Sequence, residues 1–276
     1  MISMSTPPYT PIARRFASTA RLFSAEQFAA LRAAHIGVVG LGGVGSWAAE
    51  ALARSGVGRL TLVDMDHVAE SNLNRQVQAL HSTLGAAKGE ALTARIRDIA
   101  PDCVVNVVDA FLNPENAAEI IGRDPSRLAS RGDADQDASA SIWIDATDDL
   151  PAKRAMVLLM CEQKRLKNLV VSGGAGGKTD PTRVEIADLS EATQDALLST
   201  LRYDLRKNCG FPRHGKMKIQ AVVCRQPMVK SEDCDPAAKL ACAGYGSLVT
   251  VTATMGLVAA NLAILRCMEL KLTKKN

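Results

Sequence analysis

The sequence has few aromatic residues and no closely paired cysteines. Phe, Trp and Tyr make up 4% of the 276 residues, so the core must be largely aliphatic and stacking platforms for single-stranded bases must be few. Seven cysteines are present, but no two form a C-x-x-C pair, which argues against a zinc site built on paired knuckles. Because their number is odd and no apolar leader segment precedes them, we expect free thiols and a cytoplasmic protein.

Charge of one sign is not in large excess either. The chain carries 33 Lys and Arg against 29 Asp and Glu, which excludes the profile of a dedicated DNA-binding module but permits contact with nucleic acid. Residues 1–20 are predicted to be a flexible tail before a first helix near Ser24–Ala34, and residues 268–276 a basic tail. The uncharged run Gly246–Leu265 is long enough to span a membrane, but its Ser, Thr and Asn residues favour a core helix over membrane contact.

Between the two ends, short apolar runs alternate with helical patterns. The runs interpreted as strands are 35–40, 59–64, 104–109, 142–145 and 168–172, and the helical patterns are 43–54, 88–99, 114–122 and 151–164. This alternation predicts an α/β fold with a Rossmann-like, mostly parallel sheet and helices on both faces. We expect an ATP-binding adenylating domain over 21–267, in which a nucleotide-binding half (21–165) is followed by a substrate and dimer half (166–267) that extends the same sheet. A mobile insertion is predicted at 124–140.

A glycine motif follows the first predicted strand and opens the next helix. Gly40, Gly42, Gly43 and Gly45 match G-x-G-x-x-G, in which the backbone approaches a pyrophosphate and the helix N-terminus offers free N–H groups. Asp64 ends the next strand, where an acid usually holds a ribose. The pattern indicates a nucleotide but no reaction, so an NAD-dependent oxidoreductase is the default reading unless other residues argue against it.

Three further charged residues favour nucleotidyl transfer instead. Arg75 and Lys88 would neutralise a triphosphate if they converge on the glycine loop, and Asp148 follows a strand, where a carboxylate could hold Mg²⁺. Cations and a metal around a triphosphate are what nucleotidyl transfer needs, and a dehydrogenase has no use for them.

These motifs together resemble the ubiquitin-activating-enzyme-like (HesA/MoeB/ThiF) adenylating superfamily. The similarity rests on G-x-G-G-x-G, on D-x-D at Asp64 and Asp66, on N-x-x-R-Q at Asn72, Arg75 and Gln76, and on T-D-D ending at Asp149. The segments RRFASTARLFSAEQF, GVGSWAAEALARSGVGRLTLVDMD, GGAGGKTDPT and CAGYGSLVTVTATMGLVA resemble the tRNA threonylcarbamoyladenosine dehydratase branch.

The resemblance implies an activity and a set of roles. Members of the superfamily join ATP to a carboxylate and release pyrophosphate, and in this branch the carboxylate belongs to threonylcarbamoyladenosine beside the tRNA anticodon. The activated carboxylate would then be attacked from within the modification, with AMP as leaving group. The resemblance further implies a homodimer in which Arg15 or Arg21 reaches the partner's ATP, and a cysteine desulfurase or sulfur-acceptor partner. It assigns phosphate, ribose and magnesium contacts to Gly40, Gly42, Gly43, Gly45, Asp64, Asp66, Asn72, Arg75, Gln76, Lys88 and Asp148.

Several alternatives stay open at this point. An adenylating enzyme for the C-terminus of a ubiquitin-like or sulfur-carrier protein is the second hypothesis, which the missing zinc pairs weaken. Cys242 could form a thioester from the acyl-adenylate or be a small buried residue. The segment Ser172–Thr179 imitates a P-loop, but a strand rather than a helix is predicted after it, at Thr182–Ala187. The basic run Leu201–Arg225 is either a solvated face or a phosphate-contacting surface.

Overall fold

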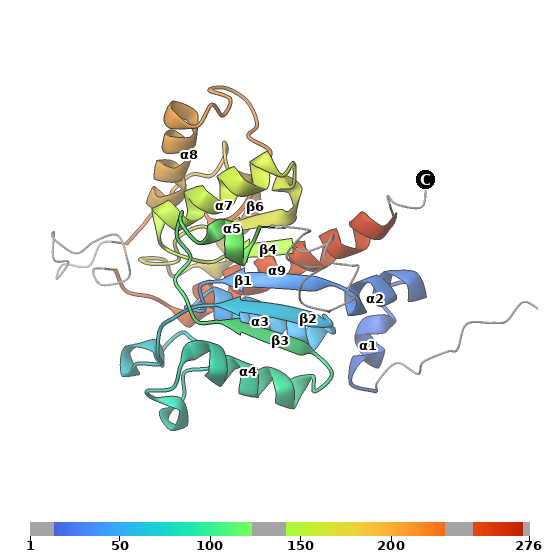
Figure 1. Ribbon diagram of the computed structural model, residues 1–276. Coiled ribbons are helices and arrows are strands. Elements are labelled where there is room, and N and C mark those ends of the chain that lie inside the picture. The colour runs from blue at the N-terminus through green and yellow to red at the C-terminus, as the bar shows by residue number, and fades with distance from the viewer. Residues whose placement is uncertain (1–13, 123–141, 230–244, 273–276) are drawn as a thin grey trace, which may run out of the picture.

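One mixed sheet of seven strands organises the computed structural model, which describes residues 14–122, 142–229 and 245–272 (Figure 1). The first six strands in the order below are parallel, and β6 is antiparallel to β7. The mostly parallel sheet is therefore confirmed, as is its extension by the C-terminal half. The order is β3 (Val104–Val108), β2 (Arg59–Val63), β1 (His35–Val39), β4 (Ile142–Asp145), β5 (Leu169–Ser172), β7 (Gln220–Cys224) and β6 (Val184–Asp188).

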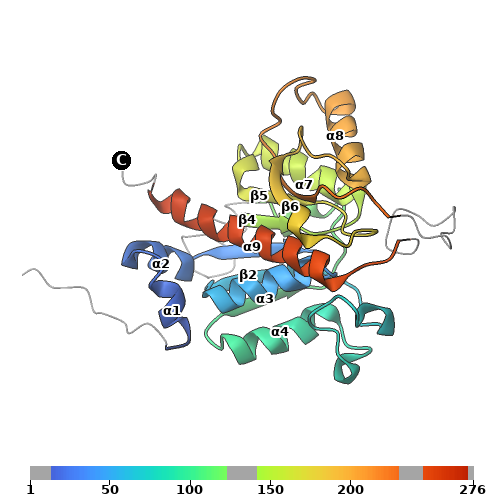
Figure 2. The ribbon, with the colours of Figure 1, turned by 180° about the vertical axis from the view of Figure 1, so that it is seen from behind.

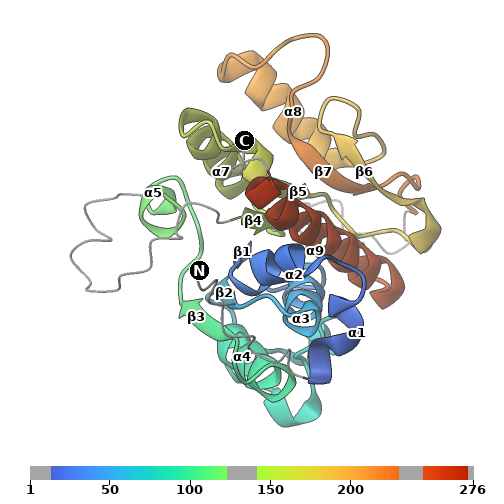
Figure 3. The ribbon, with the colours of Figure 1, turned by 90° about the vertical axis from the view of Figure 1, so that its right-hand side faces the viewer.

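Helices cover both faces of the sheet, and Figure 3 shows them on either side of it. One face carries α2 (Ala25–Arg32), α3 (Gly45–Ser55), α4 (Lys88–Ile99) and α9 (Val249–Leu272), and the other carries α5 (Ala117–Ile120), α7 (Leu150–Glu162) and α8 (Ala196–Asn208). Each face has its own apolar core, because side chains alternate along the strands: Ile36 and Val38 of β1 pack in the first core and Val39 in the second.

The long apolar helix α9 lies across the first face, where it packs on α3, α2 and the strands β4 to β7 (Figure 2). Its residues Val249–Met268 are long and apolar enough to cross a membrane, but most of them are buried inside the fold. Gly256 lets α9 approach α3 closely, since a Cβ there would lie 2.4 Å from the Val44 carbonyl oxygen. The helix therefore packs as the core helix that its polar residues favoured, and it joins the two halves of the chain.

The ends of the fold differ from the prediction. Helical structure begins with η1 (Arg14–Phe16) and α1 (Ala17–Ala20), inside the predicted tail, because Phe16 is buried against α2 and α3. Helix α9 continues to Leu272 and so includes the start of the predicted basic tail. The predicted insertion at 124–140 lies outside the described residues, and α8 and β7 are additions to the prediction. The remaining short helices are η2 (Glu70–Asn72), η3 (His81–Thr83), η5 (Leu166–Asn168) and η6 (Pro181–Arg183).

Candidate active site

A cavity of about 670 Å³ opens where the parallel strands end. The chain runs from β1 outward to β3 and then returns to add β4 on the other side of β1, which makes this the switch point where α/β sheets bind ligands. The loops after β1, β2, β4 and β5 therefore all face one space. Its polar lining includes Gly40, Gly42, Gly43, Asp64, Asp66, Asn72, Arg75, Gln76, Lys88, Asp148, Gly174, Lys178 and Asp195.

The glycine loop after β1 fits a close backbone approach. Gly40 has a φ of +84°, and a Cβ on Gly45 would lie 1.8 Å from the Gly40 carbonyl oxygen, so neither position accepts another residue without rearrangement. A Cβ on Gly42 would meet no protein atom within 4 Å. The loop leads into the N-terminus of α3, which has no side-chain cap. The absence of a side chain at Gly42 therefore leaves space in the cavity, whereas at Gly40 and Gly45 it leaves space for neighbouring backbone.

Asp64 fixes this loop to the end of β2. Its carboxylate accepts hydrogen bonds from the backbone N–H of Leu41 at 2.6 Å and of Asp66 at 2.8 Å, and the side chain is largely buried. Both bonds hold the acid in one orientation at the cavity wall. Its predicted contact with a ribose stays a prediction.

Asp66, the second acid of D-x-D, holds Lys88 in the cavity. The Lys88 ammonium lies 2.7 Å from the Asp66 carboxylate, with the lysine side chain 7% exposed and the aspartate 52%. The Lys88 backbone N–H also donates to the Asp66 carbonyl, at the start of α4. Lys88 was predicted to contact phosphates, and the structure places its nearly buried ammonium at the cavity.

The N-x-x-R-Q segment supplies the next wall. The Arg75 guanidinium donates to the Ser71 carbonyl at 2.7 Å and to the Asn74 side chain at 2.9 Å, and Arg75 borders Gly43 of the loop. The buried Asn72 side chain accepts from the Ala69 N–H, which stabilises the turn that carries the arginine. The nearby Gln76 is also buried and accepts a hydrogen bond from the Gln78 side chain.

The two acids after β4 have different surroundings. Both are exposed and line the cavity, but Asp149 also caps α7 by accepting from the Ala152 N–H at 2.9 Å. Among the described residues, no group of three or more His, Cys, Asp or Glu could enclose a metal. The exposed Asp148 carboxylate would suit Mg²⁺, which is commonly held by one or two carboxylates together with substrate phosphates and water.

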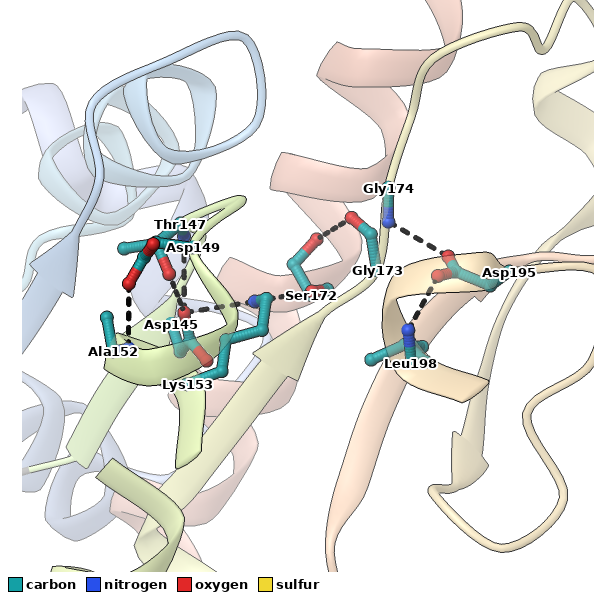
Figure 4. Close-up of polar contacts among 10 residues, drawn as sticks. All are labelled: Asp145, Thr147, Asp149, Ala152, Lys153, Ser172, Gly173, Gly174, Asp195 and Leu198. Atoms are coloured by element: carbon teal, nitrogen blue, oxygen red, sulfur yellow. Dashed lines mark hydrogen bonds and ion pairs between the residues drawn. The ribbon is translucent and has the colours of Figure 1, made fainter. Parts of the chain in front are cut away.

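A buried ion pair that sequence reasoning missed joins β4 to β5 (Figure 4). The Lys153 ammonium lies 3.0 Å from the Asp145 carboxylate and 2.8 Å from the Ser172 carbonyl oxygen, and both charged side chains are fully buried. Thr147 also donates to Asp145. These contacts fix the distance between the two strand ends that form the cavity floor. The sequence signal was an acid ending a buried strand, with a lysine in the first turn of the next helix.

A second missed residue, Asp195, borders the cavity at the start of α8. Its carboxylate accepts from the Gly174 N–H and the Leu198 N–H, both at 2.9 Å, and burial raises the pKa of Asp195. A Cβ on Gly173 would lie 2.1 Å from this carboxylate, which explains the glycine at position 173. Figure 4 shows the resulting link between the 173–174 backbone and α8. Only the fold places these residues together.

Lys178 confirms that the apparent P-loop is a different structure. Its buried ammonium donates to the carbonyls of Gln194 at 2.8 Å, of Gln226 at 3.1 Å and of Cys224, and burial lowers its pKa. The segment continues into η6 and β6 rather than into a long helix. The lysine therefore joins three chain segments at the cavity wall.

The two N-terminal arginines do not line this cavity. Arg15 lies 3.6 Å from the Asp102 carboxylate, just before β3 begins, and Arg21 ends α1. Both lie near the edge of the sheet where the strands start. Cys242 lies outside the described residues.

Comparison with known proteins identifies relatives over nearly the whole chain. The ThiF family model matches residues 15–275. The chain is 40% identical over 264 residues to a tRNA threonylcarbamoyladenosine dehydratase of Haemophilus influenzae, covering 94% of this chain and 95% of the relative. It is 38% identical to the dehydratase of the same name from Escherichia coli, covering 92% and 94%.

Solved structures give the same result. The crystal structure of the E. coli dehydratase TcdA in complex with ATP matches with a TM-score of 0.78 and 39% identity, over 95% of this chain and 96% of that one. Its complex with AMP matches with a TM-score of 0.79. By contrast, the molybdopterin-synthase adenylyltransferase of H. influenzae matches only 33% of this chain. Because the family model matches residues 15–275 and the H. influenzae relative is 40% identical over 94% of the chain, this chain belongs to the ThiF family.

Proposed function

We propose that this protein is an ATP-dependent tRNA threonylcarbamoyladenosine dehydratase. The observation that carries the proposal is the convergence of the glycine loop, Asp64, Lys88, Arg75 and Asp148 on one cavity at the strand ends. This set suits a nucleotide with a charged phosphate chain better than a nicotinamide dinucleotide. The near full-length similarity to the E. coli dehydratase, which was solved with ATP, favours the dehydratase over enzymes that adenylate a protein C-terminus.

Each side of the cavity would contact a different part of ATP. The backbone of the glycine loop and the N-terminus of α3 would hold the phosphates. Asp64 would accept from the ribose hydroxyls, at a place where the loop already fixes its orientation. Arg75 and Lys88 would balance the charge that develops on the phosphates during transfer, and Asp66 keeps the Lys88 ammonium in place.

Asp148 is the residue that would hold Mg²⁺. Bound there with the phosphates, the ion would neutralise charge on the departing pyrophosphate. The neighbouring Asp149 already uses one carboxylate oxygen to cap α7.

The reaction then has two steps. A carboxylate oxygen of the threonyl group attacks the α-phosphorus, the bond from that phosphorus to the bridging oxygen breaks, and pyrophosphate leaves. A nucleophilic atom of the same modification then attacks the acyl carbon, loses its proton, and displaces AMP. The net change is the loss of one water from the modified adenosine, with ATP converted to AMP and pyrophosphate.

The N-terminal arginines favour a homodimer under this proposal. Arg15 and Arg21 lie near the edge where the strands begin, whereas the cavity opens where they end. If either contacts ATP, it does so in a partner subunit. We also expect a cytoplasmic location, with tRNA as substrate, and a cysteine desulfurase or sulfur acceptor as a further partner.

Pyrophosphate release from ATP tests the proposal. Purified protein is mixed with tRNA that carries threonylcarbamoyladenosine, or with the same tRNA without it. We expect release only with the modified tRNA, lost in Asp148→Ala and kept in Asp98→Ala, an exposed acid on α4. Release that depends on a ubiquitin-like protein and ignores tRNA would support the sulfur-carrier alternative. Binding of NAD without any pyrophosphate release would support an oxidoreductase.

A further inference from the structure

The cavity continues onto the surface of α8. A second hollow of about 420 Å³ shares Asp195, Ala196 and Met228 with the cavity, and its other side is lined by Ser199 and Arg202. Arg202 is oriented by hydrogen bonds to the carbonyls of Leu189 and Ala192. A ligand held in the cavity could therefore extend across Asp195 toward the first turns of α8.

Positive charge follows directly after this hollow. Arg206 lies one turn beyond Arg202, and burial together with the Arg206 charge lowers the pKa of Arg202. Arg206 in turn donates to the Pro212 carbonyl at 3.1 Å, which brings the loop after α8 beside the helix. The α8 basic surface, as we define it, consists of Arg202, Arg206, Lys207, Arg213, Lys216 and Lys218.

The acids near this surface offset only part of the charge of its six cations. Asp204 is paired with Arg154 of α7. Burial raises the pKa of Asp188, but hydrogen bonds from Ser190 and from the backbone N–H groups of Met217 and Lys218 outweigh this effect and lower it. Asp188 thus stays charged while it anchors the loop that carries the cations. In the described part of the chain, the four outermost cations (Lys207, Arg213, Lys216 and Lys218) are exposed and form no ion pair.

We propose that the hollow and the α8 basic surface form the docking track for the RNA strand that flanks the modified nucleoside. The hollow receives a neighbouring nucleotide, and the cations contact the phosphates that follow it. Helix α8, along which the track runs, has 13 residues and is about 20 Å long at 1.5 Å per residue. This inference rests on the proposed function, and it assigns to α8 a role outside the ATP site.

The salt dependence of RNA binding tests whether these cations contact RNA phosphates. The track variant combines Lys207→Ala, Arg213→Ala and Lys216→Ala, and the control combines Arg97→Ala, Lys164→Ala and Lys167→Ala. The control loses the same charge from exposed residues outside the α8 basic surface: Arg97 lies on α4, and Lys164 and Lys167 lie between α7 and β5. The probe is an unmodified tRNA transcript without ATP. We expect the track variant to lower the slope of log affinity against log salt by about 2 to 3, and the affinity at 0.1 M salt by about tenfold.

The control variant should bind this tRNA within about twofold of the wild type. Equal binding by the track variant and the wild type would overturn the inference, and so would an equal loss in the control. The binding assay needs no turnover. A wild type that binds through the track but never processes modified tRNA would therefore refute only the proposed function.

Filling the hollow gives a second test. Ser199→Trp should raise the KM for modified tRNA about tenfold or more and leave the KM for ATP unchanged, because the hollow lies outside the phosphate walls. Thr200→Trp, the adjacent exposed position that does not line the hollow, is the control. An unchanged KM for tRNA in Ser199→Trp, or an equal rise in both variants, would exclude the hollow as part of the track.

Discussion

Replacing Lys153 by methionine should destabilise the protein strongly, because the change leaves a charge buried without its partner. Lys153 and Asp145 are both fully buried. Without the ammonium, Asp145 keeps only the hydrogen bonds from Thr147, and its second oxygen already has no hydrogen-bond partner. Breaking a buried pair in this way costs about 3–5 kcal/mol. The Ser172 carbonyl would also lose its donor, so the end of β5 at the cavity should become less ordered.

Urea denaturation measures this loss directly, as a lower midpoint at an unchanged slope. At about 2–4 °C per kcal/mol for a chain somewhat smaller than this one, the melting temperature should fall by roughly 10 °C. The double variant Asp145→Asn/Lys153→Met should recover more than half of the loss, because no charge is left buried. Lys167→Met, an exposed lysine before β5, is the matched control and should change stability by less than about 0.5 kcal/mol. A loss below about 1 kcal/mol in Lys153→Met, or a double variant no more stable than the single one, would refute the reasoning.

Three further predictions concern the loop, the metal and pH. Gly45→Ala should lower stability and abolish ATP binding, because its Cβ would collide with the Gly40 carbonyl, whereas Gly42→Ala should keep the melting temperature and weaken only ATP binding by calorimetry. Asp148→Ala should leave metal-free nucleotide affinity within about threefold but remove the gain in ATP affinity that Mg²⁺ gives the wild type; an undiminished Mg²⁺ effect on ATP affinity would contradict that assignment. Burial raises the pKa of Glu50, but hydrogen bonds from Arg95 and Arg54 outweigh this effect and lower it. The Glu50 carboxylate therefore stabilises the fold above its ordinary pKa of 4.5, and that contribution is lost as the pH falls through the lower folded value. Glu50→Gln should accordingly be less stable than the wild type at pH 7, with the difference shrinking below pH 4.5 in urea titrations.

The sequence predicted those features that depend on neighbouring residues. The first five strands alternate with helices in a local pattern, and their observed ends fall within about a residue or two of the predicted ones. The glycine loop and the acid after β2 were recognisable because their spacing is fixed by one strand, one turn and one helix. The same local logic rejected the P-loop reading of the segment that contains Lys178.

Residues that depend on distant contacts were missed. Asp195 meets Gly174 only because α8 starts beside the end of β5, and no local pattern shows that approach. Strand β7 was hidden in a basic segment, since Gln220–Cys224 is short and lies between arginines and lysines. Phe16 extended the ordered fold into the predicted tail by packing on α3, which a Ser- and Arg-rich segment does not reveal. In each case tertiary packing outweighed the local composition.

The central claim is that ATP drives the loss of water from a tRNA modification. Mass spectrometry of nucleosides, prepared under conditions that keep the ring closed, tests it most directly. tRNA carrying threonylcarbamoyladenosine is incubated with the protein, ATP and Mg²⁺. We predict that the modified adenosine loses the mass of one water, with one AMP and one pyrophosphate formed per nucleoside converted and none in Asp148→Ala. An unchanged nucleoside mass in the presence of ATP would contradict the account, even if the protein binds both ATP and tRNA.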